Sequence, residues 1–293
     1  MAGLPLVFGG SRVKVYVSVD MEGVSGLTDP DDMHPGGTGY PLGQEYMTGD
    51  ANAAVRGAFD AGAAEVLVND AHSKARNLRL DLIDPRCRVI RGRNRPLRMG
   101  QGLEVSTTAA LLVGYHSRAG ADTCGVLSHT WMGREIENVL LNGRVVGETG
   151  LVAALAGSMG VPVALVTGDE AVCEEARELL GDIETVAVKR GLDRFSADLL
   201  PPMAAQARIQ EGAVRALGRL GELRPWTVES PVVFGVEWNS TSLASMCALM
   251  PQVRQVGPRH TEYVADTMTD VIQVLGVMSL LAAQLASDAG VYG

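Results

Sequence analysis

Polar side chains suited to metal binding follow three apolar segments that are typical of buried strands. Asp20 ends the segment KVYVSVD, and Glu22 lies two residues further on. His72 lies just after EVLVN, and His116 directly follows AALLVGY. Because the carboxyl ends of parallel strands meet at one edge of a sheet, we expect these side chains to lie close together.

The residue types at this edge indicate a metal site. Two imidazoles with several carboxylates suit Zn²⁺, Mn²⁺ or Co²⁺, and no cysteine occurs at these strand ends. A catalytic zinc uses few protein ligands and keeps one position for water. With Glu148 as a further candidate, the set is too large for one open zinc site. It suits two metals that share a bridging carboxylate, roughly 3.5–4 Å apart.

Each of these residues also has a purely structural explanation. Asp20 and Glu22 could be a capping and a solvated residue in a glycine-containing turn. His72 could lie in a polar loop, and His116 could hydrogen-bond to the backbone at a strand end. Glu148 in the first turn of a helix is accounted for by the helix dipole.

The remaining histidines carry weaker signals. His129 lies in VLSHT without any metal-binding spacing, which leaves its role open between structure and chemistry. A nucleophilic pair with the nearby Cys124 is a conceivable alternative. His34 and His260 lie in loop-like sequence, and we expect both at the surface.

The elements that would position these residues alternate between strand and helix. Predicted strands cover residues 14–20, 65–69, 87–90, 109–115 and 162–167, and predicted helices cover 44–61, 148–159 and 172–180. This alternation predicts an α/β fold, a Rossmann-like three-layer α/β/α domain with a mostly parallel sheet. Asn142-Gly143 between two apolar runs predicts a hairpin over residues 136–146.

The regular alternation of predicted strands and helices changes after about residue 190. Helices are predicted at 201–220 and 243–249, strands at 231–237 and 253–256, and a long helix ends the chain. We therefore expect a metal-binding domain over residues 12–190. A second, smaller α/β domain would cover residues 191–293, interlinked with the first and involved in oligomer contacts.

Composition excludes several functional classes. The chain has 293 residues and a net charge of −9, and its basic residues form no run of five or more, which argues against nucleic acid as a partner. Four scattered cysteines favour free buried thiols in a reducing compartment. The first dozen residues make a poor signal peptide. The apolar segment 271–286 is shorter than a membrane span and predicts a buried helix. We expect a cytoplasmic protein without membrane contact.

Several separated motifs occur together in a known order. They are SVDMEGVSG (18–26), VLVNDAHSK (66–74), GYH (114–116), GVLSH (125–129), NGRVVGETG (142–150) and ALMP (248–251). In these motifs the chain resembles the DppA-type D-aminopeptidases, the zinc aminopeptidases of the bacterial dipeptide-transport operon. The resemblance covers the chain from about Arg12.

The resemblance implies roles for individual residues. Asp20, Glu22, His72, His116 and Glu148 match the metal ligands of the family, and His129 matches a catalytic candidate near the metals. It also implies two zinc ions per subunit, for which Mn²⁺ or Co²⁺ could substitute. A homodecamer of two stacked pentamers is implied as well. The loop 117–124 is about two residues longer than expected for the family.

The expected activity is hydrolysis of the N-terminal residue from a short peptide or amino-acid amide by a metal-activated water. The sequence leaves the preference for D- or L-residues and the general base open. One alternative is a two-metal phosphoesterase, which the absence of a Lys/Arg cluster beside these strands would disfavour. Another is a non-catalytic, ring-forming peptide-binding protein.

Overall fold

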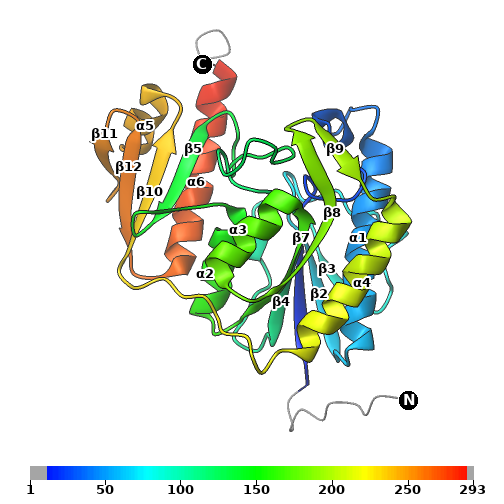
Figure 1. The fold of residues 1–293 in the computed structure, drawn as a ribbon. Helices are drawn as coiled ribbons and strands as arrows, with labels where there is room; N and C mark the ends of the chain where they lie inside the picture. The colour runs from blue at the N-terminus through cyan, green and yellow to red at the C-terminus, as the bar shows by residue number, and fades with distance from the viewer. Residues whose placement is uncertain (1–11, 289–293) are drawn as a thin grey trace.

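The structure is a computed structural model that describes residues 12–288. The expectation about a signal peptide falls almost entirely on residues 1–11, which lie outside this range. A seven-stranded sheet runs through the larger part of the molecule (Figure 1). Its strands are β1 (Lys14–Val19), β2 (Glu65–Asp70), β3 (Arg88–Ile90), β4 (Ala109–Tyr115), β7 (Val163–Asp169), β8 (Glu184–Asp193) and β9 (Ser196–Leu199).

The order of these strands is β3-β2-β1-β4-β7-β8-β9. All neighbours pair in parallel except β8 and β9, which are antiparallel. Every residue of β4 and β7 is buried, as expected for central parallel strands that are covered on both faces. This explains why their sequences are continuous apolar runs rather than alternating ones.

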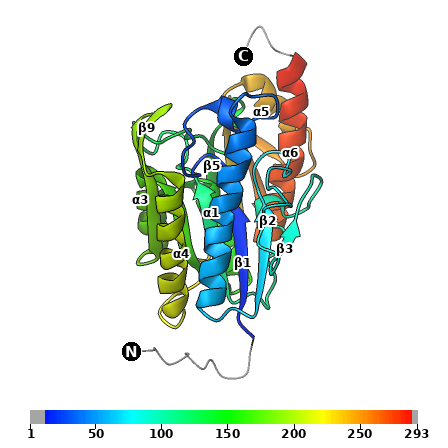
Figure 2. The ribbon, with the colours of Figure 1, turned by 90° about the vertical axis from the view of Figure 1, so that its right-hand side faces the viewer.

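Four helices cover the two faces of this sheet. They are α1 (Tyr40–Asp60), α2 (Glu148–Ser158), α3 (Glu170–Leu180) and α4 (Pro202–Gly218). α1 and α4 pack side by side on one face (Figure 2), while α2 and α3 contact the sheet from the other. The predicted three-layer α/β/α architecture with a mostly parallel sheet is thereby confirmed.

A second, antiparallel sheet lies beside the three-layer α/β/α unit. It is built from β5 (Ile136–Leu141), β6 (Arg144–Val146), β10 (Val232–Trp238), β11 (Arg254–Gly257) and β12 (His260–Ala265), in the order β11-β12-β10-β5-β6. The helices α5 (Thr241–Cys247) and α6 (Met268–Asp288) pack against it. The predicted hairpin connects β5 and β6, and Asn142 and Gly143 have φ angles of 49° and 80° at its turn.

The two sheets exchange segments along the chain. The expected division between residues 190 and 191 falls inside β8, and β9 and α4 continue the first unit. In return, β5 pairs with β10 in the second sheet, and β6 pairs with β5 at the edge of that sheet. The sequence did not predict β8, β9 or β12, because charged and polar residues interrupt them and they lack the long apolar runs of the central strands.

α6 is longer than the sequence predicted. Its window Met268–Leu285 has a mean hydropathy of 1.5 and is long and apolar enough to cross a membrane, so the expectation of a segment too short for a span was wrong. Only 39% of this window is buried inside the molecule. α6 nevertheless packs against α2, α5, β10 and β12, which is the role of a core helix with one exposed side.

Candidate metal centre

The centre lies where the strand order of the parallel sheet reverses. The chain proceeds from β1 to β2 and β3 in one direction, and from β4 to β7 and β8 in the other. Open α/β sheets bind ligands in the crevice at such a point, outside the carboxyl ends of the strands. Asp20 follows β1 and His116 follows β4, so the two side chains start from the two sides of this crevice.

Two glycines let the strand ends approach each other. A Cβ on Gly23 would lie 1.8 Å from the carbonyl oxygen of Tyr115. Gly114 has a φ of +69°, and a Cβ there would lie 2.5 Å from the carbonyl oxygen of Asp20. The amide of Gly23 instead donates to the carbonyl of Gly114 at 2.8 Å. Both glycines are therefore required by the close contact that joins the two strand ends.

The structure brings the five candidate ligands into two groups that share Asp20. In the first group, His72 Nδ1 lies 3.3 Å from Asp20 Oδ1 and 3.0 Å from Glu22 Oε2. In the second group, His116 Nε2 lies 3.6 Å from Asp20 Oδ2 and 3.3 Å from Glu148 Oε1. All five side chains are buried. A carboxylate common to two ligand groups is the arrangement that a bridged metal pair requires.

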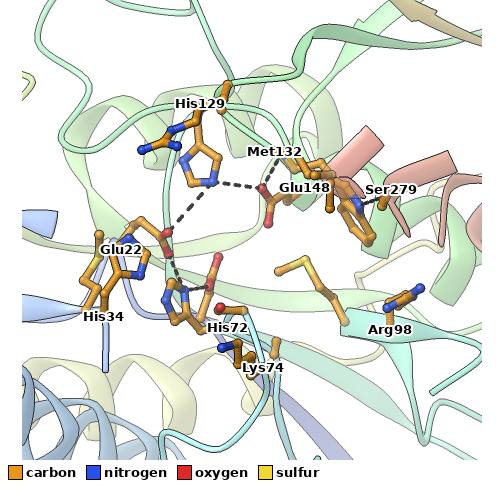
Figure 3. Close-up of a pocket in the computed structure, with 18 of the residues that line it drawn as sticks. Glu22, His34, His72, Lys74, Arg98, His129, Met132, Glu148 and Ser279 are labelled. Carbon is orange, nitrogen blue, oxygen red and sulfur yellow. Dashed lines mark hydrogen bonds and ion pairs between the residues drawn. The ribbon is translucent and has the colours of Figure 1, made fainter. Parts of the chain in front are cut away.

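His129 lies against the second of these groups (Figure 3). Its ring stacks on His116 with centroids 4.1 Å apart and an interplanar angle of 12°. Its Nε2 lies 3.8 Å from Glu22 Oε1 and 3.7 Å from Glu148 Oε1. Its Nδ1 is 2.9 Å from the carbonyl oxygen of Leu127, which orients the neutral ring with Nε2 as the acceptor.

The alternative of a Cys124–His129 nucleophile pair is not formed. The thiol of Cys124 donates to the carbonyl of Leu192 and contacts Thr123. All four cysteines are free, as expected, and Cys173 and Cys247 are buried. Cys87 and Cys124 are only partly buried, in contrast to the expectation of buried thiols.

The shifted pKa values and unpaired polar atoms of the centre indicate that it binds cations. Burial, reinforced by Glu22, raises the pKa of Asp20 to about 7. Burial alone would lower the pKa of His72 and His116, yet the adjacent carboxylates raise both pKa values well above the ordinary one. The atoms Asp20 Oδ2, His72 Nε2 and His116 Nε2 are buried without a hydrogen-bond partner. Two divalent cations would satisfy these atoms and offset the carboxylates, so the residues fit such a pair.

Comparison with known proteins decides the family. The family model for D-aminopeptidases matches residues 13–277.

The chain belongs to the D-aminopeptidase family.

A D-aminopeptidase from Bacillus subtilis (strain 168) is 37% identical over 271 residues, which cover 92% of this chain and 98% of that protein. A solved structure of the zinc-dependent D-aminopeptidase DppA from Bacillus subtilis, described as a self-compartmentalizing protease, superposes with a TM-score of 0.90 at 36% identity. That match covers 93% of this chain and 98% of the other. The predicted family, fold class and enzyme class, a metal-dependent aminopeptidase, are thus confirmed. The roles of individual residues stay predictions.

Lys189 of this D-aminopeptidase family member holds the loop that carries Glu22. It lies in β8, and its Nζ donates to the carbonyl oxygens of Glu22 (2.6 Å), Val24 (3.0 Å) and Leu27 (2.7 Å). Burial lowers the pKa of Lys189 to about 8, although Asp169 and Asp50 favour its charged form. No local sequence pattern indicated this role, because Lys189 and the residues it contacts are more than 160 positions apart.

Replacing Lys189 with methionine is expected to loosen this loop. Three buried carbonyl groups lose a charged donor, and the free energy of unfolding should fall on the order of 3 kcal/mol. Denaturant unfolding measures this loss, and metal analysis should show weaker metal retention. Lys14→Met is the matched control, because the side chain of Lys14 contacts Glu104 and Ser106 at the other end of β1. Equal stability and metal content in the two variants would contradict the role.

A pocket with a cavity volume of about 1060 Å³ opens onto the centre. Asp20, Glu22, His72, His129 and Glu148 line its floor. Several segments that the sequence did not connect with the site also line it, and two of them lie close to Glu148. They are the segment around Trp131 and Met132, and residues 279–283 of α6.

Two further contacts tie this pocket wall to the centre. The amide of Trp131 donates to Glu148 Oε1 at 2.8 Å, and its indole nitrogen donates to Ser279 Oγ at 2.7 Å. His34 is exposed, as expected, but it lines the same pocket, and its ring centroid is 6.2 Å from that of His72 (Figure 3).

Proposed function

We propose that this chain is a zinc-dependent aminopeptidase that removes the N-terminal residue, in the D-configuration, from short peptides or amino-acid amides. The observation that carries the proposal is the pair of buried ligand groups that share Asp20 and leave ligand atoms without protein partners. The zinc dependence of the Bacillus subtilis relative supports the choice of metal. Membership in the D-aminopeptidase family favours this activity over the phosphoesterase alternative.

The buried residues divide into two ligand sets. Asp20 would bridge two zinc ions, with Glu22 and His72 on one side and His116 and Glu148 on the other. His116 Nδ1 lies 2.9 Å from the carbonyl oxygen of Ser117, which leaves its Nε2 free to bind a cation. Zinc, when bound, supplies a Lewis acid and lowers the pKa of water toward neutrality.

The chain's own residues would then bind and orient the peptide. The substrate's amino group would lie at the metal centre, close to its carboxylates, which accounts for cleavage at the amino end. His129 would accept a proton at its Nε2 and pass it to the leaving amine, and the imidazolium formed in between would stabilise the oxyanion at the scissile carbonyl. Burial and the adjacent His116 lower the pKa of His129, which favours the neutral ring that can accept this proton.

A homo-oligomer that encloses its active sites is part of the proposal. The relative is described as self-compartmentalizing, and this chain covers nearly its whole length. Two stacked pentamers remain the predicted arrangement, and the cytoplasm the predicted location. Light scattering on the purified protein would give the number of subunits.

Metal removal is the direct test of the proposed function. We expect close to two zinc ions per chain, loss of activity after exhaustive chelation, and recovery when zinc is returned. A kinetic screen of D- and L-amino-acid amides and dipeptides, with zinc, manganese and cobalt, would show the preferred configuration and metal. Full activity after complete chelation would refute the proposal, as would the absence of turnover on the entire panel.

A further inference from the structure

One wall of the active-site pocket is cationic. It is formed by residues 73–74 and 93–98, and it presents the four side chains Lys74, Arg93, Arg95 and Arg98. Figure 3 shows Lys74 close to His72, with Arg98 further along the pocket. This concentration of positive charge stands out in a chain whose net charge is −9.

These four cations have no carboxylate partner within the described part of the chain. Arg95 donates to the amide oxygen of Asn69, and Arg98 donates to the carbonyl of Gly276 at 2.8 Å. Lys74 and Arg93 make no side-chain hydrogen bond or ion pair with any residue in the range 12–285. Asp70 acts on Arg95 only at longer range.

Some arginines elsewhere in the molecule are paired with carboxylates. Arg79 pairs with Asp81 at 2.6 Å, Arg86 with Asp84 at 2.7 Å, and other exposed arginines have similar acidic partners. The four cations of the pocket wall have no such acidic partner. Its positive charge is left available for a ligand.

The protein holds these cations in place next to the metal centre. Lys74 lies two residues after His72, so their Cα atoms are at most about 7 Å apart. Its neighbours Ser73 and Ala75 have φ angles of 48° and 52°, a left-handed conformation that is unfavourable for both residue types. The side chain of Asn77 fixes this turn by donating to the carbonyl of His72 and to Asp70, both at 2.8 Å.

The charge balance of the occupied site favours an anionic ligand group. Two divalent cations would offset the carboxylates of Asp20, Glu22 and Glu148. Glu135, the other carboxylate that lines the pocket, follows Arg134 in the sequence, and burial raises its pKa. Positive charge then prevails along this wall, where Arg95 and Arg98 are partly buried while Lys74 and Arg93 are exposed to solvent.

We propose that Lys74, Arg93, Arg95 and Arg98 bind the free C-terminal carboxylate of a short peptide whose amino end lies at the metal centre. This inference rests on the proposed function. It assigns the carboxyl end of a di- or tripeptide to this wall, because such a peptide extends about 3.3–3.6 Å per residue and Lys74 follows His72 by two residues. Amino-acid amides lack the carboxylate and would be poorer substrates.

The same cations also bear on the phosphoesterase alternative. We expected no Lys/Arg cluster beside these strands, and that expectation was wrong, because the chain folds the segment 93–98 over the crevice. Guanidinium groups bind phosphate as well as carboxylate. Turnover of p-nitrophenyl phosphate is therefore measured alongside peptide hydrolysis.

The test compares two substrates with the same scissile bond. They are dialanine, in the configuration that the screen above favours, and its C-terminal amide. The zinc-loaded wild type should prefer the free acid by on the order of 10- to 100-fold in kcat/KM, and the preference should shrink as salt is added. The double variant Lys74→Gln/Arg93→Gln should lose at least about tenfold of this preference, mainly through a higher KM for the free acid.

Controls separate the possible failures. Lys14→Gln removes a lysine far from the pocket and should behave as the wild type. Equal rates on the acid and the amide in the wild type would overturn the carboxylate site while leaving the aminopeptidase intact. An equal loss on both substrates in the double variant would also overturn it. If neither substrate is cleaved and p-nitrophenyl phosphate is, both the inference and the proposed function fail.

Discussion

Replacing His116 with alanine is expected to abolish metal binding at one position and peptide hydrolysis together. His116 is buried at the end of β4, and its Nε2 faces Asp20 and Glu148 without a hydrogen-bond partner. The alanine variant removes the imidazole ligand and leaves only the two carboxylates to bind the metal. Loss of groups that merely orient a ligand costs 10- to 100-fold, so loss of the ligand itself should lower kcat/KM by more than about 100-fold.

The measurement is metal content by elemental analysis, together with hydrolysis of an amino-acid p-nitroanilide. His260→Ala is the matched control, since His260 lies in β12 of the second sheet and outside the pocket. It should keep both metal and activity. A His116→Ala protein that turns over the substrate at the wild-type rate would remove His116 from the site and, with it, the shared-carboxylate arrangement.

Replacing His129 with alanine is expected to separate chemistry from metal binding. If His129 acts on the substrate, the variant should retain its zinc while kcat falls about 10²- to 10⁴-fold, the range for lost acid–base catalysis. The wild-type rate should decline as pH falls through the pKa of His129, which burial and His116 hold below its ordinary value. This acidic limb of the profile should be absent from the variant.

Chemical rescue sharpens this second test. A cavity of about 400 Å³ lies next to His129 and is lined by Ala119, Gly120 and Ser128, among others. Added imidazole could enter there and restore part of the activity of His129→Ala. Loss of zinc from this variant would instead make His129 a metal ligand, consistent with its distances of 3.8 Å to Glu22 and 3.7 Å to Glu148.

The metal ligands and the cations of the pocket wall come from different kinds of structural element. The metal ligands are buried and come from the ends of strands and the start of α2, elements held by many backbone hydrogen bonds. The cations come from a turn and an irregular segment at the pocket wall. Variants at the wall should therefore alter the choice of substrate with little loss of stability, whereas variants such as Lys189→Met act on the framework.

The sequence by itself determined the convergence of Asp20, His72 and His116. Each follows an apolar run, and such runs form parallel strands whose carboxyl ends share one edge. The hairpin at Asn142-Gly143 could be predicted for a similar reason, because its turn depends on local backbone preference. Glu148 was placed by the start of a helix, and its role came from the family resemblance rather than from spacing.

Only the tertiary structure decided the rest. Lys189 reaches the loop that carries Glu22 across more than 160 residues, and the segment 93–98 joins the pocket through contacts that no local pattern encodes. The exchange of β5–β6 and β9–α4 between the two units depends on which sheet edge each segment meets. Such choices are set by packing between distant parts of the chain, whereas strands, turns and helix starts are set by the neighbouring residues themselves.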